Sequence, residues 1–239
     1  MRIVFLTGAG MSAESGVPTF RDALTGLWSR YDAEQLATPE AFMHDPALCW
    51  GWYRWRAALV RRARPNAGHL GIAALARGGH AVSVITQNVD DLHERAGSSG
   101  VVHLHGSLFA SRCMDCAHQP TPDPILDGQD ALLEGARESP PPCPACGGMI
   151  RPGVVWFGEA LPDEAWNAAC AALEDCALLV VIGTSGLVHP AASLPQRARR
   201  GGVRVLEINP VESAVSAYAD ERLPMTASAG VQVLLDRLA

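Results

Sequence analysis

The stretch RIVFLTGAGMSA, residues 2–13, joins an apolar run to a turn rich in glycine. After its first residue, the segment 2–6 is apolar at odd and even positions alike, which is typical of a parallel strand covered by helices on both faces. Gly8 and Gly10 follow at once, and Ala13 stands where dinucleotide-binding turns have a third glycine or alanine. Glycines there let the backbone approach a pyrophosphate, and the helix that follows offers free N–H groups. The stretch therefore predicts a phosphate-binding turn, with a glycine turn that binds no ligand as the alternative.

Similar apolar runs, rich in β-branched residues, recur along the chain. They cover residues 81–86, 101–104, 177–183 and 203–209. Helical spacing of apolar residues lies between them, at 67–78, 163–176 and 191–202, although Pro195 is out of place in the last. Alternation of strand and helix predicts a Rossmann-like, doubly wound parallel α/β sheet.

Two segments depart from this alternation. Residues 29–64 look all-helical, with Thr38 as an N-cap and Pro39 at a first helical position. Residues 110–150 are polar, irregular and rich in Pro and Cys. We expect the helical insertion and the cysteine-rich module to form a small lobe. The Rossmann-like domain is then expected to comprise 1–28, 65–109 and 151–239.

Composition narrows the class of protein. The formal net charge of -6 argues against a direct nucleic-acid binder, which would usually present a basic face. No charged segment followed by a long apolar stretch opens the sequence, and no apolar run reaches membrane-spanning length. We therefore expect a cytoplasmic protein that does not bind membranes, and nothing requires more than a monomer. All 19 basic residues are Arg, so the chain cannot itself be acylated on a lysine side chain.

Four of the seven cysteines form two C-x-x-C pairs, Cys113 with Cys116 and Cys143 with Cys146. Paired spacing in a cytosolic chain indicates a metal site before disulfides or free thiols. Four thiolates leave no open coordination position, so we expect one structural zinc that stabilises a segment too irregular to form its own core. The other cysteines stand in apolar helical contexts and are expected to be buried side chains: Cys49, Cys170 and Cys176.

Polar residues follow two of the predicted strands. Asn88 and Asp90 come just after the strand 81–86, where ligands bind in open α/β sheets. The acidic residue that would bind ribose in a dehydrogenase, about twenty residues after the glycine turn, is absent, because residues 26–32 read GLWSRYD.

Three histidines compete for the role of general base. His105 precedes a glycine at a predicted strand end, where a base active near neutral pH could stand. His93 and His103 look the same in the sequence, and each of the three could equally be a structural histidine. Spacing alone does not rank them.

Six motifs, taken in order, resemble one family. They are GAGMSAESGVPTFR (8–21), TQNVDDLHERAG (86–97), HLHGSL (103–108), the two C-x-x-C pairs, RPGVVWFGE (151–159) and GTSGLVHPA (183–191). Together they resemble the sirtuins, which are NAD-dependent protein deacylases, over nearly the whole chain. The resemblance also accounts for the missing dehydrogenase acid, because sirtuins consume NAD and transfer no hydride.

The resemblance implies where NAD binds. The first motif matches the loop over the NAD phosphates and nicotinamide ribose, the second matches the nicotinamide pocket, and later segments match the adenosine contacts. The implied NAD-contacting residues are Gly8, Ala9, Gly10, Ser12, Glu14, Phe20, Arg21, Gln87, Asn88, Asp90, Gly183, Thr184, Ser185, Asn209 and Ala229.

The resemblance also assigns chemistry and substrate. It implies that His105 is the catalytic base, and that the acyl group of an acyl-lysine protein or peptide is transferred to ADP-ribose with release of nicotinamide and lysine. The peptide is implied to lie as an added strand between two walls. One wall is Val155, Phe157, Gly158 and Glu159, and the other is Gly186, Leu187 and Val188.

Residues 50–56 read WGWYRWR, in which Tyr53 and Arg56 share one helix face. A guanidinium can hold a carboxylate bidentately, and a phenol adds one donor. The pattern resembles the Tyr-x-x-Arg signature of desuccinylase and demalonylase sirtuins, and Ala23 resembles the small residue that widens their acyl pocket. We therefore expect a preference for succinyl or malonyl groups, with acetyl also removed.

Three alternatives remain open. They are a plain deacetylase, a mono-ADP-ribosyl transferase using the same NAD site, and an NAD-binding regulatory or scaffold protein without turnover. Within the same helical segment, the tryptophans Trp50, Trp52 and Trp55 are expected to pack, and a solvated face is expected from Arg54, Arg61, Arg62 and Arg64.

Overall fold

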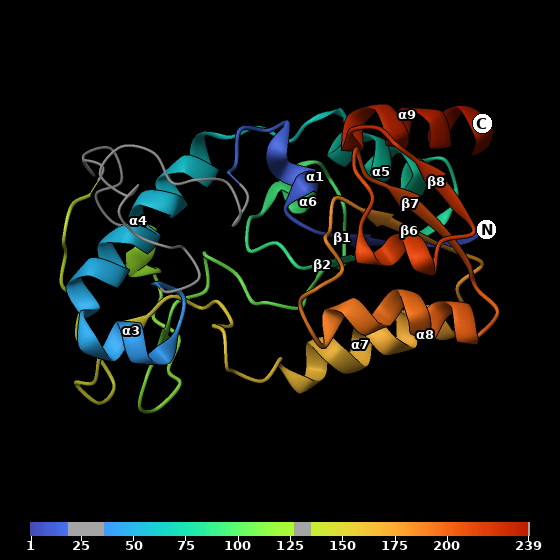
Figure 1. Cartoon of the computed structure of the whole chain (residues 1–239). Helices are drawn as coiled ribbons and strands as arrows, with labels where there is room; N and C mark the ends of the chain where they lie inside the picture. Colours follow the sequence, from blue (N-terminus) through green and yellow to red (C-terminus); the bar gives the residue numbers. More distant parts are fainter. Residues whose placement is uncertain (19–35, 127–134, 239) are drawn as a thin grey trace. The chain divides into compact units, whose positions relative to one another are not determined.

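A six-stranded sheet, parallel throughout, organises the larger part of the chain in a computed structural model that describes residues 1–18, 36–126 and 135–238 (Figure 1). Its order is β3-β2-β1-β6-β7-β8. The strands are β1 (Arg2–Thr7), β2 (Ala81–Thr86), β3 (Val102–His103), β6 (Leu178–Ile182), β7 (Arg204–Ile208) and β8 (Glu221–Leu223). The predicted doubly wound parallel sheet is confirmed.

The strand order reverses beside β1. This strand pairs with β2 on one side, with Phe5 opposite Val84, and with β6 on the other, with Phe5 opposite Val180. The connections leave β1 and β6 in opposite directions, which opens a crevice at the carboxyl ends of the strands. A ligand site is therefore expected at this edge.

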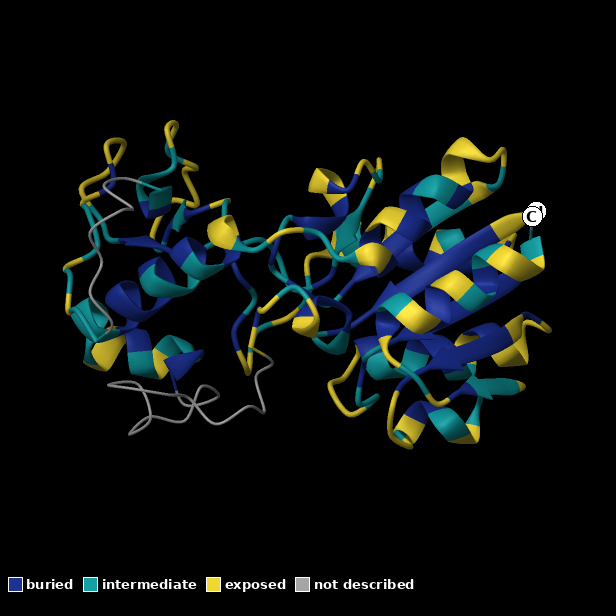
Figure 2. Cartoon of the chain, turned by 90° about the horizontal axis from the view of Figure 1, so that it is seen from above, coloured by how far each residue is buried: buried dark blue, intermediate teal, exposed yellow. Residues whose placement is uncertain are grey.

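Helices cover both faces of the sheet. α5 (Ala67–Arg77) and α9 (Ala227–Leu238) lie on one face, and α7 (Asp163–Glu174) and α8 (Leu194–Arg200) on the other (Figure 1). Alternate residues of β1 serve the two cores: Ile3 and Phe5 pack toward α5 and α9, and Val4 and Leu6 toward α7 and α8. Figure 2 shows the central strands as continuously buried, and these are β1, β6 and β7. Burial of each of these apolar side chains contributes roughly 1.5–3 kcal/mol to the free energy of unfolding.

Some elements differ from the prediction or are absent from it. The helical segment 191–202 is a 3₁₀ turn (Ala191–Ser193) followed by α8, and Pro195 lies in the first turn of α8, where its missing N–H costs nothing. The helix expected after the glycine turn is α1 (Gly10–Ala13). The elements α9 and β8 were not predicted, nor were the short helix α6 (Leu92–Arg95) and the 3₁₀ turn η5 (Ala214–Ala217). β8 has only three residues, two of them charged.

The inserted segments contain α3 (Pro39–His44), α4 (Pro46–Arg62), the 3₁₀ turn η2 (Pro124–Leu126) and an antiparallel pair, β4 (Arg112–Cys113) with β5 (Ile150–Arg151). The predicted N-cap is confirmed, because Ala41 N donates to Thr38 Oγ at 3.1 Å and Pro39 opens α3.

Contacts divide the chain into two units. The first comprises Met1–Thr19, Arg64–Leu104 and Leu161–Ala239, and the second Phe20–Ala63 and His105–Ala160. The boundaries expected from the sequence placed 105–109 and 151–160 with the Rossmann-like domain, whereas these residues pack within the second unit. The reason is local pairing between the two segments: Val155 N donates to the His105 carbonyl at 2.8 Å, and Ser107 N to the Gly153 carbonyl at 3.1 Å.

Within the described ranges, no helix is both long enough and apolar enough to cross a membrane.

The turn after β6 gives a stability test. Gly183 has φ +62°, and a Cβ there would lie 2.5 Å from the carbonyl carbon of Gly10. Gly202 has φ +80°, but a Cβ there would have no heavy atom within 4 Å, so it is a control for backbone strain alone. We expect Gly202→Ala to cost about 1–2 kcal/mol and Gly183→Ala at least about 2 kcal/mol more. Urea unfolding at equilibrium measures both, and equal losses would contradict the tight packing of the two turns.

Candidate functional site

Two glycine turns meet at the carboxyl edge of the sheet. A Cβ on Gly8 would lie 2.7 Å from Thr184 Cβ, and one on Gly10 would lie 2.8 Å from Gly183 Cα. Gly10 N donates to the Gly183 carbonyl at 2.8 Å. The glycines are therefore required by the approach of the turn after β1 to the turn after β6. The helix that follows, α1, is only one turn long, much shorter than the predicted phosphate-binding helix.

A buried hydrogen-bond network joins three of the predicted NAD-contacting residues. Ser12 Oγ donates to Asp90 Oδ2 at 2.8 Å, and Asn88 Nδ2 donates to Ser12 Oγ at 3.1 Å. Leu92 N donates to Asp90 Oδ1 at 3.1 Å. Burial raises the pKa of Asp90, and the hydrogen bonds from Leu92 and Ser12 oppose that shift. The network fixes the Asn88 side chain next to the glycine turn.

A second chain of hydrogen bonds joins the Asn88 backbone to Thr86, Thr7 and His93. Asn88 N donates to Thr86 Oγ at 3.0 Å, and the Thr7 hydroxyl donates to Thr86 Oγ at 2.9 Å. Because the single Thr7 proton is used there, the His93 Nε2–H, 3.0 Å away, donates to Thr7 Oγ. Burial lowers the pKa of His93 to about 3, so the ring is neutral. His93 is thus a buried, neutral ring that is hydrogen-bonded to Thr7.

His103 and His105 differ in their surroundings. His103 lies 2.7 Å from a Glu94 carboxylate oxygen through Nε2 and 3.1 Å from the Asn88 carbonyl through Nδ1. Burial lowers the pKa of His103, but the Glu94 carboxylate outweighs it and holds that pKa above its usual value. His103 is thus committed to an ion pair within the first unit. His105 is half-buried and belongs to the second unit.

Thr184 links the predicted nicotinamide and adenosine residues. Gln87 Nε2 donates to Thr184 Oγ at 3.0 Å, and Asn209 Nδ2 donates to the Thr184 carbonyl at 3.0 Å. The Ser185 carbonyl accepts a hydrogen bond from Ala214 N at 3.1 Å. The side chain of Gln87 therefore bonds across the edge to the turn after β6, which spacing in the sequence did not indicate.

The remaining predicted NAD-contacting residues have separate positions. Glu14 is exposed, and Ser228 N donates to its carboxylate at 2.9 Å, next to the exposed Ala229 on α9. Phe20 and Arg21, together with the pocket residue Ala23, lie outside the described residues.

In the second unit, Tyr53 and Arg56 lie on α4. Tyr53 is 2% exposed, and its ring meets Trp52 edge-on at 4.7 Å. The Arg56 guanidinium lies over the Trp52 ring, 4.9 Å from its centroid. Burial raises the pKa of Tyr53, and the positive charge of Arg56 only partly opposes this, so the phenol stays protonated.

Other predictions for this helical segment have mixed outcomes. Trp50 and Trp52 are fully buried, and Trp55 is half-buried, as expected for packing residues. Arg54 is an exception to the expected solvated face, because it is 7% exposed and pairs with Glu138 at 2.6 Å. The cause is close packing of α4 against the segment that carries Glu138. The other three arginines are at least partly exposed, as predicted: Arg61, Arg62 and Arg64.

The segment 151–159 is held by a buried cation. Arg151 is 4% exposed, donates to both Glu159 carboxylate oxygens at 2.5 and 2.9 Å, and places its guanidinium 3.3 Å from the Trp156 ring centroid. Trp156 N also donates to Glu159 at 2.8 Å. The Glu159 carboxylate, expected at a substrate wall, is therefore engaged within its own segment.

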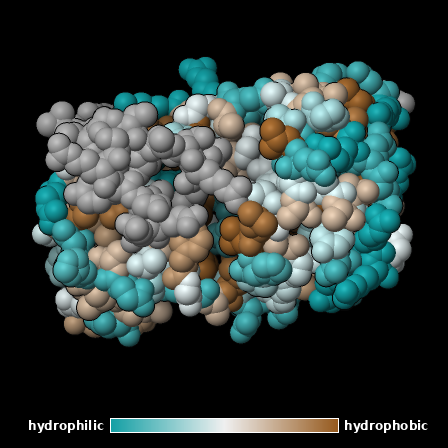
Figure 3. Space-filling view, in the orientation of Figure 1, coloured by the Kyte–Doolittle hydropathy of each residue, from teal (hydrophilic) through white to brown (hydrophobic). Residues whose placement is uncertain are grey.

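Several large apolar side chains at the predicted walls are exposed. Phe157 is 40% exposed in the second unit, beside Val155, which is half-buried, and Gly158, which has φ +88°. Leu187 and Val188, which follow Gly186 in the first unit, are 60% and 37% exposed. On the face drawn in Figure 3, strongly hydrophobic residues form a few separate patches within a largely polar surface.

The four paired cysteines form one cluster. All four sulfur atoms lie within 4.8 Å of one another, with Cys113 and Cys146 sulfurs 3.5 Å apart and Cys116 and Cys143 sulfurs 3.8 Å apart. Disulfide sulfurs would be about 2.05 Å apart, whereas four sulfurs around one zinc stand roughly 3.8 Å apart. Backbone N–H groups of Asp115 and of Ala145 point at cluster sulfurs. The cluster fits a structural zinc ion with no open position. The other three cysteines are buried, as predicted.

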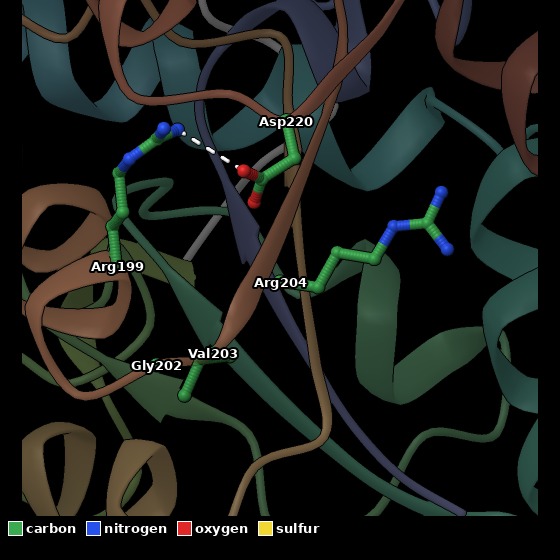
Figure 4. A pocket seen from close by; sticks show the side chains of 5 residues that line it. All are labelled: Arg199, Gly202, Val203, Arg204 and Asp220. Atoms are coloured by element: carbon green, nitrogen blue, oxygen red, sulfur yellow. Dashed lines mark ion pairs between the residues drawn. The ribbon is translucent and has the colours of Figure 1, made fainter.

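A pocket of about 500 Å³ lies at the other, amino end of β7 (Figure 4). Arg199 and Asp220 pair across it at 3.2 Å, and Arg204 pairs with Glu221 at 2.8 Å. Its charges satisfy each other, and it lies away from the carboxyl edge, so we assign it no function.

Comparison with known proteins identifies the family. Residues 8–190 match the model of the Sir2 family, and the chain belongs to that family. It is 53% identical over 237 residues to an NAD-dependent protein deacylase of Methylococcus capsulatus, covering 99% of this chain and 92% of that protein. A solved Sir2 homolog–NAD complex superposes with a TM-score of 0.87 at 45% identity, covering 99% and 88% of the two chains. Sir2Tm bound to a propionylated peptide gives a TM-score of 0.81 at 30% identity, with coverage of 98% and 92%.

The cysteine cluster predicts metal content. We expect about one zinc per chain, because four thiolates close the coordination sphere. Cys146→Ser should lose most of the zinc and expose the segment to proteases, whereas Cys170→Ala, at a buried cysteine outside the cluster, should keep the metal. Metal analysis by mass spectrometry after gel filtration measures this. Equal zinc in the two variants would contradict the site.

Proposed function

We propose that this chain is an NAD-dependent protein-lysine deacylase with a preference for acidic acyl groups. The observation that carries the proposal is the buried network of Ser12, Asn88 and Asp90 beside two close-packed glycine turns at the switch point of the sheet. A ligand-binding edge with a fixed carboxamide suits a dinucleotide whose nicotinamide must be oriented. Membership of the Sir2 family and similarity to a named deacylase support the same function.

NAD is assigned to the carboxyl edge of the first unit. The turn at Gly8 and Gly10 takes the phosphates, Asn88 and Asp90 take nicotinamide, and the adenosine lies toward the turn after β6. This arrangement is supported by the hydrogen bonds of Thr184, which tie the ends of β2, β6 and β7 together. The bound NAD supplies a glycosidic bond that is labile once a nucleophile approaches.

The reaction follows from these assignments. The acyl-lysine amide oxygen bonds to C1′ of the nicotinamide ribose as the C1′–nicotinamide bond breaks. Since an amide oxygen is a weak nucleophile, the site acts mainly by orientation and by stabilising positive charge on the ribose. His105 then takes the proton of a ribose hydroxyl, which attacks the imidate carbon. Water completes release of lysine and O-acyl-ADP-ribose.

Tyr53 and Arg56 are proposed to bind the carboxylate of a succinyl or malonyl group. A carboxylate in an apolar acyl pocket costs several kcal/mol unless it is paired. Tyr53 is a buried, protonated donor, and the positive charge of Arg56 acts to lower its pKa, against the larger effect of burial. A plain deacetylase without this preference is the alternative, and a protein that binds NAD without turnover is a second.

The partners are then acyl-lysine proteins or peptides, and a cytoplasmic location stays part of the proposal. It is supported by the cysteine cluster, whose four sulfurs are separate thiols rather than disulfides, as expected in a reducing compartment.

Turnover tests the deacylase proposal. On an acyl-lysine peptide with NAD, we expect equal amounts of nicotinamide and free lysine, and all acyl-lysine signal comes from the peptide because the chain has no Lys. His105→Tyr should lower turnover by about 100-fold or more with zinc content unchanged. His44→Tyr, at an exposed histidine of the same unit, is the control. NAD binding without nicotinamide release would favour the non-catalytic alternative, and label from NAD on protein would favour ADP-ribosyl transfer.

Arg56→Met tests the acyl preference. On one peptide sequence carrying succinyl-lysine or acetyl-lysine, the variant should lose about 30-fold or more in kcat/KM for succinyl, because a charged hydrogen-bond partner is removed. Acetyl removal should fall far less. Arg61→Met, at an exposed arginine of the same helix, should change neither rate. Parallel loss of both activities in Arg56→Met would overturn the assignment.

A further inference from the structure

Trp156 makes a contact that the Tyr-x-x-Arg pattern does not include. Its indole Nε1–H donates to the Tyr53 hydroxyl oxygen at 2.9 Å, and both side chains are 2% exposed. The two residues are 103 positions apart in the sequence, and both belong to the second unit. A phenol hydroxyl can both accept and donate a hydrogen bond, and Trp156 uses the accepting role of the Tyr53 oxygen.

In the hydrogen bond between Trp156 and Tyr53, only one assignment of donor and acceptor is chemically possible. An indole nitrogen only donates, so the Tyr53 oxygen is the acceptor. The hydroxyl proton must then point away from Trp156. Among the described residues, no acceptor for that proton is found. A buried hydroxyl that lacks an acceptor carries a free-energy cost, which an incoming carboxylate oxygen would remove.

Trp156 is held in place from several sides. Phe42 packs against its ring with centroids 5.2 Å apart, and the Arg151 guanidinium lies on the ring. Glu159 accepts a hydrogen bond from its backbone N–H and receives both arms of Arg151. These contacts fix the position of the indole N–H. Because this N–H donates to the Tyr53 oxygen, it also fixes the direction of the Tyr53 hydroxyl.

Trp50 provides a natural contrast on the same helix as Tyr53. It is fully buried, yet among the described residues its indole N–H has no hydrogen-bond partner. A buried tryptophan in this unit thus does not acquire a hydroxyl partner simply by packing.

We propose that Trp156 is a positioning residue for acyl specificity, whose indole N–H orients the Tyr53 hydroxyl as a donor to the carboxylate of an acidic acyl group. The inference rests on the proposed preference of this chain for such groups. It extends the carboxylate-binding set from two residues on α4 to a third on the segment 151–159. Trp156 itself does not touch the substrate in this account and acts only through Tyr53.

Trp156→Phe tests the inference by acyl selectivity. The ratio of kcat/KM for succinyl-lysine to that for acetyl-lysine, on one peptide, should fall about tenfold, the value of one hydrogen bond. The loss should lie mainly in KM. Trp50→Phe removes an indole N–H of equal burial and should leave the ratio unchanged. Acetyl turnover and zinc content report whether each variant is folded.

A double-mutant cycle separates positioning from packing. If Trp156 acts through Tyr53, the variant Tyr53→Phe/Trp156→Phe should have the selectivity of Tyr53→Phe alone. If the selectivity losses of the two single variants instead multiply in the double variant, or if Trp156→Phe lowers kcat/KM equally for both acyl groups, Trp156 has a packing role and the inference is overturned. A wild type without succinyl preference would refute the proposed preference itself. A wild type with that preference, and an unchanged ratio in Trp156→Phe, would refute only the role of Trp156.

An NMR measurement compares the two acyl groups on the wild type itself, and variants serve only to assign its signals. With ¹⁵N-labelled indoles, succinyl-lysine peptide should shift the Trp156 indole signal more than acetyl-lysine peptide of the same sequence does, because the Tyr53 oxygen becomes a better acceptor when its proton is donated. The Trp50 signal, assigned from Trp50→Phe, is the reference. Equal shifts of the Trp156 signal with both peptides would contradict the inference.

Discussion

The close approach of two glycine turns at the carboxyl edge of the sheet is the constraint on which the rest of the first unit depends. Only a residue without a side chain fits where Gly8 and Gly10 meet the turn at Gly183. That approach lets the turn after β6 carry Thr184 within reach of side chains from the ends of β2 and β7. The polar edge proposed to bind NAD is thus a product of backbone packing, and its side chains are ordered before a ligand arrives.

In the second unit, side chains are likewise fixed in advance, but by an ion pair rather than by close-packed glycine turns. The ion pair of Arg151 and Glu159 fixes Trp156, and Trp156 fixes the hydroxyl of Tyr53. Rigid support of this kind reduces the free energy lost in ordering the side chains when a ligand binds. In both units a small number of buried polar contacts, rather than surface charge, determines which groups remain available for a ligand.

Local signals in the sequence predicted local structure well. The apolar run before Gly8 predicted the central strand, Thr38 predicted a helix start, and the paired cysteines predicted a cluster that fits zinc, because each signal concerns neighbouring residues. Contacts between residues distant in the sequence could not be predicted from such local signals. Burial of Arg54 depends on Glu138, and the Tyr53 hydroxyl depends on Trp156, and neither pairing has a spacing that a pattern could detect. β8 was missed because it has only three residues, two of them charged, whereas α9 was missed although its apolar residues follow helical spacing as clearly as those of α7.

The central claim is that this chain transfers an acyl group from lysine to ADP-ribose. Mass spectrometry of the nucleotide formed at early times, from NAD and a succinyl-lysine peptide, tests it most directly. The account predicts O-succinyl-ADP-ribose in amounts equal to the nicotinamide released, with unmodified lysine on the peptide. Free succinate and ADP-ribose from the first time point, in buffer where the ester is stable, or ADP-ribose bound to protein, would contradict it.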